Sequence, residues 1–257
     1  MDSPNPFRAA WSMLRARRVS PPHVHGSASA DHTGMEPVLD ALSQGGTPAL
    51  ARVQDDLQWY LAAAGSVDPT TLTYPEALAF WLNLYNAGAL NVAAQALAGG
   101  AESVLRIPRA FDAPILHIDG ERLSLDAIEH GKIRRFGDPR IHAALVCGSV
   151  SCPTLRYEPF RGDQLEAQLD DQMRRFLAGG GARLDMHTRT VHLSRVFLWY
   201  GGDFTRPNHM PTWLPARRRA LMRALLPWLD EAAAWVASGK TSVEFQPYDW
   251  GLRCSVG

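Results

Sequence analysis

The 257-residue chain has few cysteines, no net charge and no long apolar run. Three cysteines are too few, and odd in number, for the disulfide framework of a small secreted protein. This cysteine content predicts a reducing compartment. Equal numbers of basic and acidic residues, 26 of each, create no overall field that would attract nucleic acid or an anionic membrane. These absences predict a soluble, cytoplasmic protein that does not bind nucleic acid.

Recognisable membrane and cofactor signals are missing as well. No apolar run approaches the roughly 20 residues that span a bilayer, and the first residues lack the apolar core of a secretory signal. The sequence contains neither a P-loop nor the glycine-rich fingerprint of a dinucleotide-binding fold. We therefore expect no integral membrane segment and no cofactor.

Composition divides the chain into two regions. Residues 1–34 are rich in Pro, Ser, His and Gly and have little hydrophobic periodicity, which predicts a disordered N-terminal extension. The remaining residues, 35–257, are sufficient for one full hydrophobic core, and the apolar content of 46% is ordinary for a globular protein. We expect a single globular domain over this range.

Hydrophobic spacing predicts a series of helices interrupted by short β-hairpins. Helical periodicity occurs over residues 50–64, 75–98, 125–135, 165–176 and 214–236. Hairpins are predicted at residues 115–123 and 184–196, and single strands at 141–146 and 243–250. This pattern predicts the α+β class, a helix-rich single domain packed on a small antiparallel sheet, for which a papain- or transglutaminase-like arrangement is one candidate.

Two asparagines lie in the most apolar of these helices. Residues 80–87 are Phe-Trp-Leu-Asn-Leu-Tyr-Asn-Ala, which is apolar nearly all round and predicts a helix buried on most faces. Asn83 and Asn86 are three residues apart and share one side of the helix. Because buried amides must be paired, they either brace neighbouring backbone or contribute to a site.

A pair of cysteines follows the predicted strand at 141–146. Residues 146–153 are Val-Cys-Gly-Ser-Val-Ser-Cys-Pro, whose small residues and proline predict a shaped loop where the strand ends. Such loops often present reactive groups, so a thiol here could be a nucleophile, a metal ligand or half of a redox pair. Cys147 ends an apolar run and is expected to be a small buried hydrophobe. Cys152 follows Ser151 in a more polar setting and is the better candidate for a reactive thiol.

Four segments, in their order along the chain, resemble the domain of unknown function 547 family. They are residues 80–87 (FWLNLYNA), 123–130 (LSLDAIEH), 138–153 (DPRIHAALVCGSVSCP) and 197–204 (FLWYGGDF). Tyr248-Asp249-Trp250 is similar to the closing motif of that family, so the resemblance covers roughly residues 45–253. The family is largely uncharacterised, and the resemblance therefore identifies positions rather than an activity.

Within this resemblance, His130 and Cys152 match positions where the family pattern has His and Cys, and Glu129 precedes the histidine. An imidazole beside a thiol favours the reactive thiolate and can act as general base and acid once a third group orients it. Asp126 lies four residues before His130, on the same face of an α-helix, so both Asp126 and Glu129 are candidate orienting groups. Candidate contacts to the substrate or to an oxyanion are Asn83, Asn86 and Ser151.

A second arrangement of catalytic residues competes with the first. Cys152, His192 and Asp203 follow the chain order Cys, His, Asp of transglutaminase-like and papain-like enzymes. Chain order alone is weak evidence, because such triads are defined by geometry. His142, inside the predicted strand, is expected to be a satisfied core histidine.

Metal and redox chemistry are weaker interpretations of the same residues. Cys147, Cys152, His130 and His142 could supply four zinc ligands, but no familiar CxxC or HExxH spacing supports a metal site, and we expect none. A dithiol redox role is also disfavoured, since the two cysteines do not form CxxC.

The sequence thus supports two hypotheses of different kinds. The first is a cysteine-dependent hydrolase or acyl transferase that acts on an amide, a thioester or a peptide-like substrate, with Cys152 as nucleophile and His130 as base. The second is a non-catalytic module that binds a protein or a ligand, in which the same polar residues hold an irregular core together. A reactive thiol would distinguish the enzyme from the module.

Overall fold

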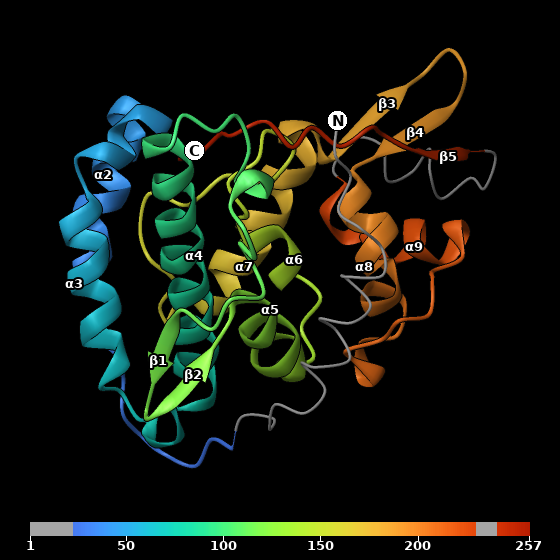
Figure 1. Ribbon diagram of the computed structural model, residues 1–257. Coiled ribbons are helices and arrows are strands. Elements are labelled where there is room, and N and C mark those ends of the chain that lie inside the picture. Colours follow the sequence, from blue (N-terminus) through green and yellow to red (C-terminus); the bar gives the residue numbers. More distant parts are fainter. Residues whose placement is uncertain (1–22, 230–240) are drawn as a thin grey trace. The chain divides into compact units, whose positions relative to one another are not determined.

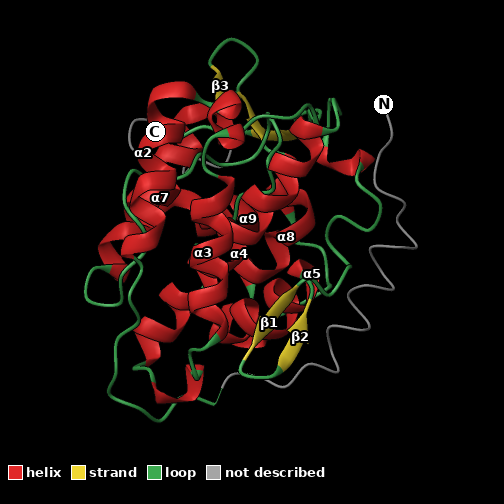
Figure 2. Cartoon of the chain, turned by 60° about the vertical axis from the view of Figure 1, so that its left-hand side comes forward, coloured by secondary structure: helices red, strands yellow, loops and turns green. Residues whose placement is uncertain are grey.

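Helices dominate the structure, a computed structural model that describes residues 23–229 and 241–257 (Figure 1). The chain divides into two compact units where the sequence predicted one globular domain over residues 35–257. Among the described residues, the first unit consists of 23–136, 145–165 and 250–257. The second consists of 137–144, 166–229 and 241–249. Figure 2 shows the strands as two small groups among the helices, as expected for the α+β class.

The first unit is built around one long buried helix. Helix α3 (Gln54–Gly65) lies beside α4 (Tyr74–Ala98), as Figure 1 shows, and α2 (Glu36–Gly45) contacts α3. The Thr73 side chain accepts a hydrogen bond from the Glu76 amide at the start of α4, Pro75 occupies its first turn, and Gly99 caps its end. From Ala77 to Leu90 every residue of α4 is buried, as the all-round apolar sequence predicted. Short 3₁₀ turns also belong to this unit: Thr33–Met35, Thr47–Ala51, Pro69–Thr71 and Val104–Arg106.

Part of the predicted N-terminal extension belongs to the first unit. Ala28 exchanges backbone hydrogen bonds with Thr71 and Thr73, each 3.0 Å long. His32 is buried, with Nδ1 2.8 Å from the Tyr60 hydroxyl. The structure thus differs from the predicted boundary at residue 34, because Ala28 contacts the start of α4 and His32 contacts α3, and the polar composition of the segment did not reveal these contacts. Residues 1–22 lie outside the described residues.

The predicted hairpin and the helix after it begin as the sequence indicated. Strands β1 (Leu116–Ile118) and β2 (Glu121–Leu123) pair antiparallel around Asp119-Gly120, and both turn residues have positive φ angles, 47° and 76°. Ser124 caps the next segment by accepting a hydrogen bond from Ala127 N at 3.1 Å. This segment is not a uniform α-helix: α5 (Leu125–Ala127) is followed by a π-helical turn (Ile128–Lys132) and a 3₁₀ turn (Ile133–Phe136).

The predicted strand at 141–146 is wrong. Residues Ile141–Ala144 form the short helix α6. Asp138 Oδ1 accepts a hydrogen bond from Arg140 N, and the amide of Ala143 donates back to Arg140 O at 3.0 Å, which starts a helical turn beside Pro139. A short buried apolar run has no periodicity that distinguishes a strand from a helix, and here the turn before it decides.

The second unit combines three helices with a small sheet. Helices α7 (Leu165–Phe176, whose first residue belongs to the first unit), α8 (Arg195–Thr205) and α9 (Arg218–Leu225) contribute to it. The sheet has the order β3 (Ala182–Asp185), β4 (Thr190–Leu193), β5 (Ser242–Phe245). Strand β5 runs parallel to β4, so this sheet is mixed and not purely antiparallel as predicted. A π-helical turn (Leu177–Gly181) and 3₁₀ turns (Pro207–His209, Leu226–Trp228) complete the unit.

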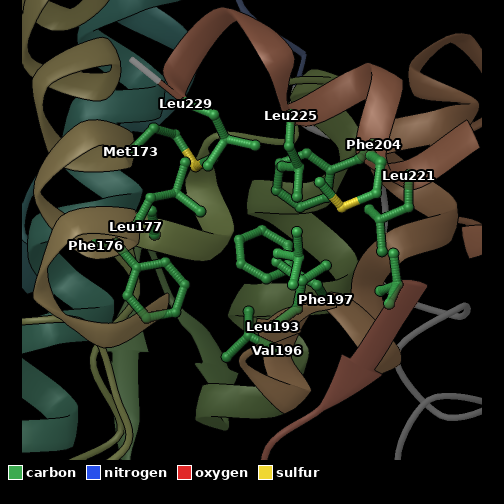
Figure 3. Close-up of a cluster of buried hydrophobic side chains, with 14 residues drawn as sticks. Met173, Phe176, Leu177, Leu193, Val196, Phe197, Phe204, Leu221, Leu225 and Leu229 are labelled. Atoms are coloured by element: carbon green, nitrogen blue, oxygen red, sulfur yellow. The ribbon is translucent and has the colours of Figure 1, made fainter. Parts of the chain in front are cut away.

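Apolar side chains from α7, α8 and α9 form the core of the second unit. Figure 3 shows Met173 and Leu177 of α7 and its π-helical extension directed toward Leu229, with Phe197 and Phe204 of α8 beside them. The Phe197 and Phe204 rings meet edge to face with centroids 5.4 Å apart.

The helix predicted over residues 214–236 is described only in part, since residues 230–240 lie outside the described ranges. Within those ranges, no helix has both the length and the apolar character needed to cross a membrane.

Candidate functional site

The cysteine loop is held on two sides by hydrogen bonds that involve its backbone. Val146 N donates to Asn86 Oδ1 of α4 at 3.0 Å, where the loop begins. Gly148 O accepts from Arg253 N at 2.9 Å, and Val150 N donates to Gly251 O at 2.9 Å. The positive φ of Gly148, 77°, turns the chain between these anchors. The loop is thus fixed by α4 and by the last residues of the chain.

Cys147 and Cys152 are joined by a disulfide across this loop. The Cys147 amide donates to Cys152 Sγ at 3.1 Å, and Cys147 Sγ lies 3.2 Å from Ser149 Oγ. Both cysteines are half-buried, as is Ser151 beside Cys152. The expectation of a buried, apolar Cys147 is therefore wrong, and the thiol expected as nucleophile is one half of a disulfide in this structure.

The third cysteine differs from this pair. Cys254 is 1% exposed, and burial raises the pKa of its thiol to about 12. Its backbone amide donates to Thr47 Oγ1 at 2.8 Å. A neutral, buried thiol is chemically inert, so reactive sulfur in this unit is confined to the loop.

His130 lies in the π-helical turn, within a buried group of polar side chains. Glu129 Oε1 is 3.6 Å from His130 Nδ1, and Arg134 Nη1 is 3.2 Å from the same nitrogen. The Tyr85 hydroxyl of α4 donates to Glu129 Oε2 at 3.2 Å. Because arginine can only donate, Nδ1 accepts from Arg134, and the neutral imidazole then carries its proton on Nε2.

Opposite charges therefore flank a single ring nitrogen. An unprotonated Nδ1 accepts a hydrogen bond from Arg134, whereas a protonated Nδ1 could donate to Glu129. His130, Glu129 and Arg134 are all buried, with Arg134 only 1% exposed. Such an arrangement can hold the imidazole in either protonation state, which is what a proton-transferring group requires.

Glu129, one of the two candidate orienting carboxylates, lies beside the His130 ring. The expectation for Asp126 assumed regular α-helical spacing over residues 126–130. Because the chain widens into a π-helical turn at Ile128, residues four apart no longer lie directly above one another. Single π-turns of this kind are frequent at functional sites.

Both asparagines of α4 brace neighbouring backbone. Asn83 Nδ2 donates to Phe160 O at 2.8 Å, and Asn83 Oδ1 accepts from Phe160 N at 2.9 Å. This paired contact uses the oxygen and one N–H of the Asn83 amide, so Asn83 braces the backbone of Phe160. Asn86 holds Val146 at the start of the cysteine loop and so positions the loop directly.

A small pocket lies next to the two asparagines. Its volume is about 220 Å³ including the part open to solvent, and its lining residues are Met35, Leu39, Asn83, Asn86, Leu155, Arg156, Glu158, Pro159 and Phe160. The enclosed part has room for about one water molecule. A substrate larger than water does not fit inside it.

In the second unit, Asp203 pairs with His142. His142 Nε2 is 2.9 Å from Asp203 Oδ2, both side chains are almost completely buried, and the Tyr200 ring stacks on the imidazole at 4.1 Å. Asp203 Oδ1 accepts from Thr212 N at 2.9 Å. His142 is thus the satisfied core histidine that the sequence predicted, and it joins the third and fourth sequence motifs.

His192 and Asp203, the histidine and aspartate of the competing arrangement, contact other residues and not each other. His192 Nδ1 is 3.5 Å from Glu244 Oε2 on the neighbouring strand, while Asp203 is engaged by His142 and Thr212. As to metal binding, no three His, Cys, Asp or Glu side chains within residues 23–229 and 241–257 are arranged to hold an ion together.

Sequence reasoning missed Arg134 and Tyr85. Arg134 is four residues after His130, a spacing that could have been noticed, but arginine is rarely buried and attracted no attention. Tyr85 lies between the two asparagines and was counted among the apolar residues of its helix. Tyr85 carries no local signal for its contact, because its partner Glu129 is 44 residues away in the chain.

A comparison with known families identifies the region that contains these residues. Residues 69–177 match the family described as "Protein of unknown function, DUF547". The matched segment includes the first three sequence motifs, with His130 and both loop cysteines, whereas residues 197–204 and 248–250 lie beyond it. No curated protein and no solved structure matches the chain.

Proposed function

Because residues 69–177 match the DUF547 family, we propose that the His and Cys of that family pattern form a catalytic pair in a cysteine-dependent hydrolase or acyl transferase. Cys152 is the nucleophile in its reduced form, and His130 is its proton-transfer partner. The substrate is an amide, a thioester or a peptide-like molecule, and the fold that supports it is papain- or transglutaminase-like.

The observation that carries this proposal is the backbone hydrogen bond at Cys152. The Cys147 amide points at Cys152 Sγ from 3.1 Å, and an N–H directed at sulfur favours the thiolate, which is the nucleophilic form. Asn86 and the backbone contacts of Gly148 hold this donor in place before any reaction. The sulfur of Cys147 lies 3.2 Å from the Ser149 hydroxyl.

The proposed steps use the groups around His130. His130 takes the proton of the Cys152 thiol, and the resulting imidazolium can donate from Nδ1 to Glu129, which Tyr85 holds in position. The thiolate attacks the acyl carbon, His130 returns the proton to the leaving group, and water or an acceptor nucleophile then releases the acyl group. Ser151, adjacent to the sulfur, is the proposed donor to the oxyanion.

Mass-resolved alkylation of the reduced protein tests the pair. After treatment with dithiothreitol, Cys152 should react with iodoacetamide faster than Cys147 at pH 6–7, and Cys254 should stay unlabelled. His130→Ala should slow the Cys152 reaction about tenfold or more at neutral pH, where a partly ionised thiol becomes an ordinary one. His192→Ala is the matched control and should leave the profile unchanged. Turnover of a 4-nitrophenyl ester or an acyl thioester should disappear in Cys152→Ser.

An ordinary thiol profile at Cys152 that is the same in wild type and His130→Ala would contradict the proposal. The non-catalytic module would then be the better interpretation. One observation favours it: Asn83, in the first family motif, braces Phe160 with both its amide oxygen and an amide N–H. In such a module the family motifs maintain a fold and not a reaction.

A further inference from the structure

The two loop cysteines are joined yet accessible. Cys147 and Cys152 are both half-buried, so a small thiol or peroxide can approach them. Their Cα atoms are 6.3 Å apart, within the range for a disulfide. Cys254, at 1% exposure, is protected from the same reagents and serves as an internal reference.

The loop has anchors that do not depend on the disulfide. Val146 is held by Asn86, Gly148 by Arg253, and Val150 by Gly251, all through hydrogen bonds of 2.9–3.0 Å. Cutting the sulfur–sulfur bond leaves these bonds in place, so the two thiols remain close to each other. Their renewed oxidation is then an intramolecular reaction with a high effective concentration.

The two sulfurs are not equivalent. Cys152 Sγ receives the Cys147 N–H at 3.1 Å, whereas Cys147 Sγ lies against the Ser149 hydroxyl. In thiol–disulfide exchange the sulfur whose thiolate is better stabilised leaves faster. An incoming thiol should therefore attack Cys147 and release Cys152 as the thiolate.

We propose that Cys147–Cys152 is a site of reversible oxidation, reduced by a dithiol and re-formed by a hydroperoxide, and that its state decides whether Cys152 can act as a nucleophile. The reversible oxidation is argued from the loop geometry alone, and only the control of Cys152 as a nucleophile rests on the proposed function.

Each step balances. One thiolate of the dithiol attacks Cys147, forms a mixed disulfide and releases the Cys152 thiolate; its second thiolate then attacks the mixed disulfide, leaves as a cyclic disulfide and releases Cys147. In the reverse direction the Cys152 thiolate reduces a hydroperoxide such as hydrogen peroxide, giving a sulfenic acid and hydroxide. The Cys147 thiol condenses with that sulfenic acid and releases water.

The test uses the full chain without denaturant. Incubation of the oxidised protein with excess reduced dithiothreitol should expose two alkylatable thiols, at Cys147 and Cys152, with no loss of the far-ultraviolet circular dichroism signal. After the dithiothreitol has been removed, an amount of hydrogen peroxide stoichiometric with the protein should abolish the labelling of both cysteines. Brief treatment with the monothiol glutathione followed by acid quenching should give a mixed disulfide on Cys147. Cys254→Ser is the matched control and should repeat all three results.

The proposal is overturned if the bond opens only in denaturant, if peroxide leaves both cysteines labelled, or if the mixed disulfide maps to Cys152. These thiol measurements do not require an activity, so they are independent of the proposed function. If the chain does hydrolyse an acyl ester, peroxide should abolish turnover and the dithiol should restore it. Full turnover by the oxidised protein would refute the control of activity, even if the redox cycle itself is observed.

Discussion

The stability of the first unit should depend on pH through His32. This residue is 5% exposed and its Nδ1 contacts the Tyr60 hydroxyl at 2.8 Å. Nε2 is buried with no hydrogen-bond partner among the described residues. Burial lowers the pKa of His32 from its usual 6.5 to about 4, and it outweighs the nearby Asp31 carboxylate, while Arg161 lowers the pKa further.

The direction of the effect follows from proton binding. Between pH 6.5 and about 4 the unfolded chain binds a proton at His32 that the folded chain does not, so the free energy of unfolding falls as the pH falls. Below about pH 4 both states are protonated and this contribution levels off. A gap of about 2.5 between the two pKa values corresponds to about 3 kcal/mol.

The test compares urea unfolding of wild type and His32→Gln at several pH values from 7 to 4. The glutamine amide oxygen can still accept the Tyr60 hydroxyl proton but does not titrate. The wild type should lose about 3 kcal/mol more than the variant over this range. His117→Gln, at an exposed histidine, should behave like the wild type. Asp31, Asp68, Asp170 and Asp185 have lowered pKa values, and their contribution begins to be lost near the acidic end of this range, but both proteins contain these residues and the comparison cancels it. Equal pH dependence in wild type and His32→Gln would refute the reasoning.

Three further predictions concern the braces around the site and the core of the second unit. Asn83→Leu should lower the free energy of unfolding by about 1–3 kcal/mol, because Phe160 loses both of its partners, and denaturant unfolding measures this directly. Gly148→Ala should cost about 1–2 kcal/mol, because alanine disfavours the φ of 77° and its Cβ would lie 3.3 Å from Ala93 and Val104. Gly179→Ala is the control and should be nearly neutral, because a Cβ there meets nothing within 4 Å. Asp203→Ala should cost about 3–5 kcal/mol, because it removes the buried carboxylate that contacts His142 Nε2 and the Thr212 amide. Glu244→Ala, which removes an exposed carboxylate, should cost less than about 1 kcal/mol, and similar melting temperatures for these two variants would contradict the buried pairing.

Features that depend on neighbours in the sequence could be predicted without the structure. Helix α4 follows from its apolar sequence, with Thr73 and Pro75 at its start and Gly99 at its end. The first hairpin follows from Asp119-Gly120, since these residues accept the positive φ angles of a tight turn. The physical reason is the same in each case: the residues that define the element lie within a few positions of one another.

The candidate site depended on contacts between segments that are far apart in the chain. The sequence identified His130, Glu129 and Cys152 as candidates, but the helical turns after Ile128 placed Arg134 beside the imidazole, and the packing of α4 brought the Tyr85 hydroxyl to Glu129. The disulfide could not be inferred from a spacing of five residues, because the closing of the loop depends on Asn86 and on the end of the chain. His142 and Asp203 are 61 residues apart, and no local pattern encodes their pairing. Buried polar groups must find hydrogen-bond partners in the folded core, and those partners come from distant segments. Only the tertiary structure shows which segments meet.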